Sequence, residues 1–81
     1  KELDLSQREF DLLTFLISNS GRVLKRETIL DEVWGYDYYG TLRTVDNFIT
    51  RLRQKLEKDS ANPQYILTVR GIGYKFNFPT D

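Results

Sequence analysis

The chain has 81 residues, 12 basic and 12 acidic side chains, and neither cysteine nor histidine. This length predicts one domain over residues 1–81. The missing cysteine and histidine argue against a disulfide framework, a zinc site and the commonest catalytic base. No apolar run approaches the roughly 20 residues that span a bilayer, and no signal peptide is visible at Lys1. We therefore expect a cytoplasmic protein that needs no membrane and no cofactor.

The charges are unevenly distributed although they cancel in total. Residues 1–42 hold five basic and eight acidic side chains, whereas residues 43–81 hold seven basic and four acidic ones. A neutral protein can present a basic face, and that face is what meets phosphate groups. The alternative interpretation is a solvated surface of mixed charge.

Two short helices are predicted in the first half of the chain. The first spans about 7–19, because Ser6-Gln7-Arg8-Glu9 has the pattern of a capping box and apolar residues follow at helical spacing. The second spans about 26–34, after a short extended link at 22–24, and ends at Gly35. Apolar residues cover a wide arc of the first helix, so part of that arc should be exposed unless a further element covers it.

The third and longest predicted helix spans about 43–58. Its apolar residues fall on one stripe at helical spacing, which should pack inward. At 100° per residue the opposite face is polar and cationic and contains no acid. That face consists of Arg43, Asn47, Thr50, Arg51, Gln54 and Lys58.

A basic hairpin is predicted at the end of the chain. Its strands span about 65–70 and 73–78, where aromatic residues alternate with polar ones. Arg70-Gly71-Ile72-Gly73 forms the tip between them. Before the third helix, a loop at 35–42 contains Tyr36, Tyr38 and Tyr39.

Three helices followed by a basic hairpin predict an α+β fold of the winged helix-turn-helix type, in which the hairpin is the wing. Arginine matches guanine edges, asparagine and glutamine match adenine, and cations at the rim suit phosphates. These features favour binding to duplex DNA. The alternative is a winged-helix module that binds proteins, which would favour apolar or acidic residues on the outer face of the third helix. An enzyme is disfavoured, because the chain has no glycine-rich phosphate loop and no evident catalytic pair of carboxylates.

Four separated segments carry a resemblance to a known family. They read LSQREFDLL from Leu5, GRVLKRETILDEVWG from Gly21, RTVDNFITRLRQKL from Arg43 and TVRGIGY from Thr68. In this wording and order the chain resembles the OmpR/PhoB family, the DNA-binding effector domains of bacterial two-component response regulators.

The resemblance implies a function and a set of partners. Family members bind direct-repeat DNA sites as head-to-tail dimers and are controlled through an N-terminal receiver domain and a sensor kinase. In them the loop between the second and third helices can contact RNA polymerase, which here would involve Tyr36, Tyr38 and Tyr39. The positions implied to meet DNA are Arg43, Asn47, Thr50, Arg51, Arg53 and Gln54 in the recognition helix, Thr68, Arg70 and Tyr74 in the wing, and Trp34.

Several roles stay open at this stage. Arg51 either reads a base or contacts a phosphate, and Arg70 contacts the minor groove or a phosphate. Arg53 either contacts a phosphate or pairs with an acid of the second helix. Trp34 belongs to the core, lies near a phosphate, or does both.

The chain also departs from the family pattern at its beginning. Family members open this domain with a four-stranded sheet, and only Leu3–Leu5 could be its last strand. We therefore expect a fragment of a longer regulator. With the sheet missing, the exposed apolar arc of the first helix should lower stability and favour self-association.

Overall fold

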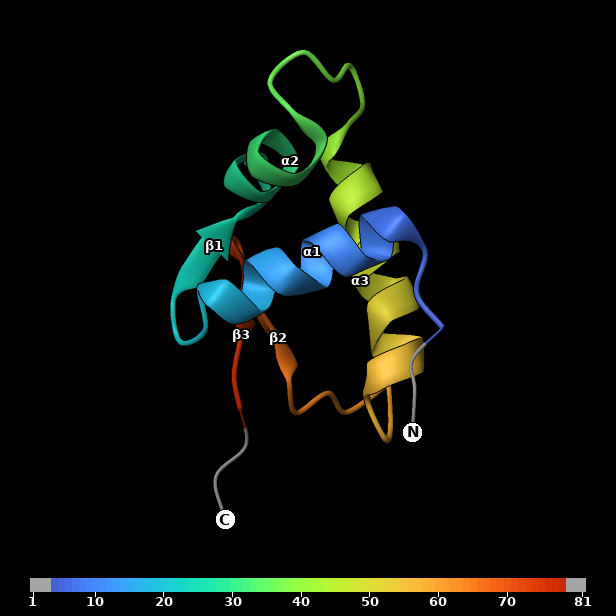
Figure 1. Cartoon of the computed structure of the whole chain (residues 1–81). Coiled ribbons are helices and arrows are strands. Elements are labelled where there is room, and N and C mark those ends of the chain that lie inside the picture. Colours follow the sequence, from blue (N-terminus) through green and yellow to red (C-terminus); the bar gives the residue numbers. More distant parts are fainter. Residues whose placement is uncertain (1–3, 79–81) are drawn as a thin grey trace.

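The computed structural model describes residues 4–78, which form three helices and a small sheet (Figure 1). The helices are α1 (Gln7–Ser18), α2 (Arg26–Trp34) and α3 (Leu42–Leu56). The strands are β1 (Val23–Lys25), β2 (Ile66–Val69) and β3 (Gly73–Phe76). The predicted winged-helix architecture is confirmed. Within the described residues, no helix combines the length and the apolar character that crossing a membrane requires.

The described part of the predicted strand at Leu3–Leu5 is not a strand. Leu3 lies outside the described residues, and Asp4 and Leu5 belong to no strand. Helix α1 begins directly afterwards with the predicted capping box. The Ser6 hydroxyl accepts from the Glu9 amide at 3.2 Å, and the Glu9 carboxylate accepts from the Ser6 amide at 2.9 Å. Two of the amides that have no partner within the helix are satisfied in this way.

The sheet has three strands in the order β1-β3-β2, and both pairings are antiparallel. The prediction of a simple extended link at residues 22–24 was therefore incomplete, because this segment becomes an edge strand. Tyr74 in the central strand faces Leu24 on one side and Thr68 on the other. The segment that joins α1 to α2 thus contributes strand β1, which pairs with β3 of the wing.

Gly73 permits the close approach of β1 and β3. A Cβ atom at this position would overlap the backbone carbonyl oxygen of Leu24. Backbone cannot move aside as a flexible side chain can, so only glycine fits without a shift of the strands. The glycine that sequence analysis placed at the tip is therefore a packing requirement of the sheet.

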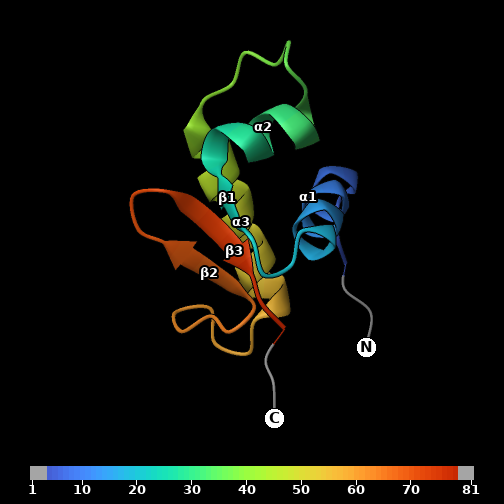
Figure 2. The ribbon, with the colours of Figure 1, turned by 90° about the vertical axis from the view of Figure 1, so that its left-hand side faces the viewer.

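The core lies between the three helices and the sheet, and its largest side chains are fully buried. Burial of each such side chain contributes roughly 1.5–3 kcal/mol. In Figure 2, α1 and the β2–β3 hairpin lie on opposite sides of the molecule. The fully buried residues are Leu12, Leu16, Ile29, Val45, Ile49, Leu52 and Ile66.

Helix α1 buries only part of its apolar arc. Leu12 and Leu16 are buried, whereas Phe10 is 54% exposed and Ile17 is 39% exposed. The expectation that part of the apolar arc would be exposed is thus confirmed. Leu13, between them, is half-buried.

Glu57 connects the end of α3 to the start of β2. Its buried carboxylate accepts hydrogen bonds from the backbone amides of Gln64, Tyr65 and Ile66 at 2.8–3.2 Å. One acidic side chain thus satisfies three consecutive amides where the chain enters the hairpin. This connection fixes the base of the wing beside the end of α3.

Candidate nucleic-acid interface

The outer face of α3 is exposed as predicted. Val45, Ile49 and Leu52 point into the core, and the polar side chains project from the other side of the helix. The exposed residues include Arg43, Asn47, Thr50, Arg51 and Gln54, and Lys58 is exposed just beyond the helix end.

Arg51 rests on an aromatic side chain. Its guanidinium carbon lies 4.6 Å from the ring centre of Phe48, within the range of a cation–π contact. The Phe48 ring meets Trp34 edge-on at 5.1 Å. Because Trp34 of α2 packs against Phe48 of α3, the ring beneath Arg51 is held in place.

Trp34 is partly buried and packs against the core. The Arg8 guanidinium lies 5.7 Å from its ring centre and also donates to the Val33 carbonyl at 2.6 Å. The prediction that Trp34 belongs to the core is therefore confirmed in part. Its proximity to a DNA phosphate stays a prediction.

Arg53 is engaged within the fold. Its guanidinium donates to the Ile66 carbonyl at 3.0 and 2.7 Å and to the Thr68 hydroxyl at 2.8 Å. The alternative in which Arg53 pairs with an acid of α2 is wrong, because this flank of α3 faces β2. Thr68 is exposed beside it, so a DNA contact from Thr68 stays open.

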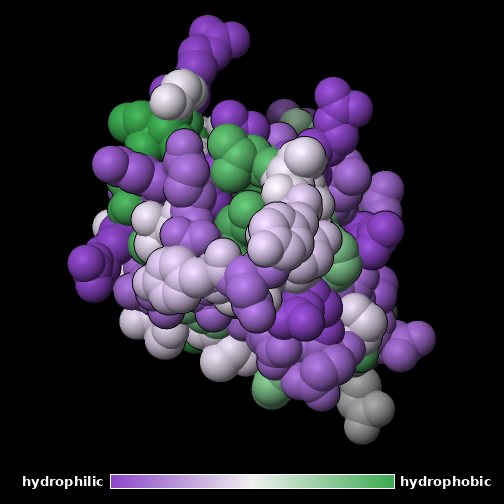
Figure 3. Space-filling view, turned by 90° about the horizontal axis from the view of Figure 1, so that it is seen from above, coloured by the Kyte–Doolittle hydropathy of each residue, from purple (hydrophilic) through white to green (hydrophobic). Residues whose placement is uncertain are grey.

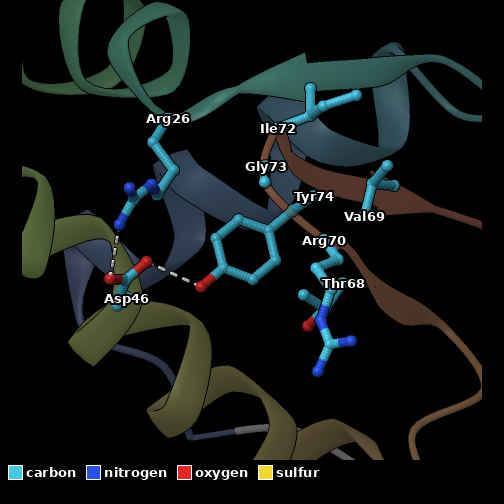
Figure 4. A pocket seen from close by; sticks show the side chains of 9 residues that line it. Arg26, Asp46, Thr68, Val69, Arg70, Ile72, Gly73 and Tyr74 are labelled. Atoms are coloured by element: carbon cyan, nitrogen blue, oxygen red, sulfur yellow. Dashed lines mark hydrogen bonds and ion pairs between the residues drawn. The ribbon is translucent and has the colours of Figure 1, made fainter.

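Tyr74 is also engaged within the fold, as Figure 4 shows. Its ring is buried, and its hydroxyl donates to the Asp46 carboxylate at 2.7 Å. The other oxygen of Asp46 accepts from Arg26 at 3.0 Å. Burial, followed by the hydrogen bond to Asp46 and its negative charge, raises the pKa of Tyr74 to about 12. This geometry does not favour the predicted direct contact of Tyr74 with DNA.

Sequence analysis did not identify Arg26 and Asp46 as parts of the site. Asp46 is an acid on the flank of a basic helix, and Arg26 is the first residue of α2. The position of Asp46 among the cations of α3 was the one signal in the sequence. Its partners Arg26 and Tyr74, however, are 20 and 28 residues away along the chain. No local periodicity identifies such partners.

The wing tip adds a cation next to α3. Arg70 and Ile72 are exposed, and Gly71 between them adopts a positive φ of 77° that glycine tolerates. Arg70 lines a shallow groove of ≈ 280 Å³ together with Arg26, Asp46 and Tyr74. The predicted wing residue therefore lies close to the start of the recognition helix.

The outer face of α3 and the wing tip carry positive charges that are not neutralised by salt bridges within the described residues. Among residues 4–78 the ion pairs are Arg8–Asp11, Arg26–Asp46 and Lys55–Glu9. Lys55 of α3 is thus paired with Glu9, whereas the cations on the outer face of α3 and at the wing tip take part in none of these pairs. The cations that remain available there are Arg43, Arg51, Lys58 and Arg70.

The loop between α2 and α3 projects from the body of the molecule (Figure 1), and Figure 3 looks onto it from above. Tyr36 is 82% exposed and Tyr39 is 98% exposed. Tyr38 lies closer to the body, with its ring centre 6.3 Å from that of Trp34. Packing of the loop thus explains the position of Tyr38, but it does not explain the exposed side chains of Tyr36 and Tyr39.

The chain is similar to transcriptional regulators over nearly its whole length. A family model described as "Transcriptional regulatory protein, C terminal" matches residues 1–76. The sensory transduction protein RegX3 of Mycolicibacterium smegmatis is 53% identical over 73 residues. That match covers 90% of this chain and 32% of RegX3, so the chain spans about a third of this relative.

Solved structures agree with this relationship. The response regulator DrrB of Thermotoga maritima, an OmpR/PhoB homologue, is 38% identical with a TM-score of 0.89, over 96% of this chain and 35% of DrrB. The DNA-binding domain of Klebsiella pneumoniae RstA, solved in complex with the RstA box, is 39% identical with a TM-score of 0.82. This match covers 93% of this chain and 74% of the RstA domain. The chain therefore belongs to the family of transcriptional regulatory protein C-terminal domains, in its OmpR/PhoB form.

Proposed function

We propose that this domain binds duplex DNA sequence-specifically and regulates transcription as the effector domain of a two-component response regulator. The observation that carries the proposal is the outer face of α3, which exposes cations and amides without an acid. Acids near α3 are held in contacts within the fold, Asp46 by Arg26 and Glu9 by Lys55. The charge presented to a phosphate backbone is therefore positive.

The recognition helix lies in the major groove in this proposal, and the wing contacts the minor groove or phosphates. Arg51 reads a guanine, because its planar fork matches two acceptors on that base and Phe48 supports it from below. Asn47 and Gln54 offer the amide groups that match adenine. Arg43 at the start of α3 and Arg70 at the wing tip contact phosphates.

Thr50 has a more limited role in this proposal. Its hydroxyl donates to the Asp46 carbonyl within α3 at 3.1 Å, which leaves its oxygen lone pairs and methyl group for DNA. Arg53 and Thr68 form the connection between helix and wing. Of these two residues, Thr68 is the more exposed.

The partners follow from the family and are proposals for this chain. The domain binds direct-repeat sites as a head-to-tail dimer, under the control of a receiver domain and a sensor kinase in a longer cytoplasmic protein. The exposed Tyr36 and Tyr39 of the α2–α3 loop, with Tyr38 beside them, contact RNA polymerase. This loop lies apart from the wing (Figure 1), so both contacts are possible at once.

Site selection from random duplex DNA, combined with a salt titration, tests the proposal. Arg51→Ala should relax discrimination at one base position by about 1–3 kcal/mol. Arg70→Ala should weaken binding to all sites and leave the preferred sequence unchanged. The parent should show a log–log salt slope of roughly −4 to −5, as expected for about four to six phosphate contacts.

Arg22→Ala is the matched control, because it removes one exposed cation from the turn between α1 and β1. It should change neither affinity nor preference. A flat salt titration of the parent would contradict DNA binding and favour the protein-binding alternative. If Arg51→Ala keeps full discrimination, then another residue reads the base.

A further inference from the structure

We propose that Arg26, Asp46 and Tyr74 form a clamp that holds the wing at a fixed angle to the recognition helix, with Tyr74 as a positioning residue. The proposal rests on the proposed function, because the angle matters only if both elements meet one ligand. It assigns Tyr74 to the geometry of the wing and not to direct contact with DNA.

The clamp joins three elements at one carboxylate. Asp46 lies in the first half of α3, Tyr74 is in the central strand β3, and Arg26 is the first residue of α2. The Asp46 oxygens accept from the Tyr74 hydroxyl at 2.7 Å and from Arg26 at 3.0 Å. Figure 4 shows the carboxylate between the two donors. Because each oxygen has its own donor, the side chain of Asp46 is fixed in one orientation.

A second contact between α3 and the sheet lies two helical turns further on. Arg53 donates to the Ile66 carbonyl and the Thr68 hydroxyl of β2. Seven residues correspond to about 10.5 Å along a helix. A hairpin held at one point can pivot, whereas one held at two separated points keeps its direction. The Arg53 guanidinium also lies 5.6 Å from the Tyr74 ring centre, which links the two contacts.

The clamp lies directly behind the cation of the wing tip. Arg70 lines the same groove as Asp46 and Tyr74. It reaches the DNA backbone in register with Arg51 only if the hairpin keeps its angle to α3. The Tyr74 pKa of about 12 keeps its hydroxyl protonated, and hence a donor, throughout the physiological pH range.

A double-mutant cycle on the selected DNA site separates positioning from general stability. Arg70→Ala should weaken binding about tenfold in the parent and less than about threefold in Tyr74→Phe, because a wing that pivots no longer delivers Arg70. Arg51→Ala should cost the same factor in both backgrounds. A general loss of stability would affect the two arginines alike.

Hydrogen exchange of the free protein provides a readout without DNA. In Tyr74→Phe the backbone amides of the wing tip should exchange faster, while those in the middle of α3 keep their protection. Tyr65→Phe is the matched control, because it removes a hydroxyl at the opposite end of the hairpin, where the ring stacks on Phe76. It should leave exchange at the tip and the effect of Arg70→Ala as in the parent.

The outcomes distinguish the clamp from the proposed function. If Tyr74→Phe and Arg70→Ala multiply as independent factors, or wing exchange is unchanged, the clamp is overturned while DNA binding stands. If the parent binds no DNA, the proposed function fails, and the exchange comparison alone decides whether Tyr74 holds the wing.

Discussion

Glu9 is a buried carboxylate that joins the start of α1 to α3. It accepts from the Lys55 ammonium at 2.7 Å and from the Ser6 amide at 2.9 Å. Lys55 donates in addition to the Asp4 carbonyl at 2.6 Å. The hydrogen bond from Lys55, and after it the one from the Ser6 backbone, hold the pKa of Glu9 below its ordinary value of 4.5. The ionised form is thus favoured in the folded state.

Acidification should therefore remove the contribution of Glu9. A carboxyl whose pKa is lower in the folded than in the unfolded state contributes its full stability above the unfolded value, and loses it as the pH falls through the folded value. At pH 7, Glu9→Gln should lower the free energy of unfolding by about 1–3 kcal/mol. The difference from the parent should shrink below pH 4.5. Urea unfolding across this range measures both effects.

Glu32→Gln is the control for this experiment, because Glu32 is an exposed acid on α2. It should follow the parent at every pH. Parallel stability curves for Glu9→Gln and the parent would show that Lys55 and Ser6 do not favour the ionised carboxylate.

The residues of the candidate site differ in how far sequence could assign them. The five predicted site positions on the outer face of α3 follow from helical periodicity alone, because one buried stripe fixes the opposite face. Arginine and tyrosine are residue types that contact DNA, but Arg53 and Tyr74 both donate hydrogen bonds to groups on another element of the fold. Only the fold brings those acceptors within reach, so sequence left their roles open or misplaced them.

Strand β1 is the element that sequence analysis did not predict. Three residues give no measurable alternation, and the pairing partner lies about fifty residues further along the chain. The other elements were predicted within about two residues, because capping boxes, amphipathic stripes and glycine turns are local signals. A short edge strand has no such signal and depends on the non-local contact with β3.

Gly73→Ala should separate β1 from β3. The added methyl group would meet the Leu24 carbonyl, so the strands must move apart. Overpacking of this kind costs about 1–3 kcal/mol. Urea unfolding should show the loss, and the amides of β1 should lose protection from hydrogen exchange before those of α3. Lys75→Ala, one strand position away from Tyr74, should leave the β1 pairing intact; equal loss in both variants would contradict the argument.

The whole molecule has two unlike surfaces. The outer face of α3 and the wing tip are polar and cationic, whereas the outer side of α1 carries an apolar stripe. Phe10, Leu13 and Ile17 follow one another at spacings of three and four residues and are half-buried or exposed. An exposed stripe contributes little to the stability of the domain and favours association with other apolar surfaces. Stability and DNA binding should therefore respond differently to changes on α1.

Substitutions on the two sides of α1 should separate these effects. Phe10→Gln and Ile17→Gln should change the free energy of unfolding by less than about 1 kcal/mol, because water already reaches both side chains. Leu12→Ala and Leu16→Ala should each cost about 2–5 kcal/mol, because both are fully buried.

Sedimentation and DNA affinity complete the comparison. The Phe10→Gln/Ile17→Gln double variant should stay monomeric at concentrations where the parent begins to associate. It should bind DNA with the affinity of the parent, because its changes lie on α1, which is on the opposite side of the molecule from the β2–β3 hairpin (Figure 2). If the double variant instead unfolds as readily as Leu12→Ala, then the apolar stripe of α1 packs against other parts of the same domain. In that case the molecule has one functional face, and α1 contributes to the core over its whole circumference.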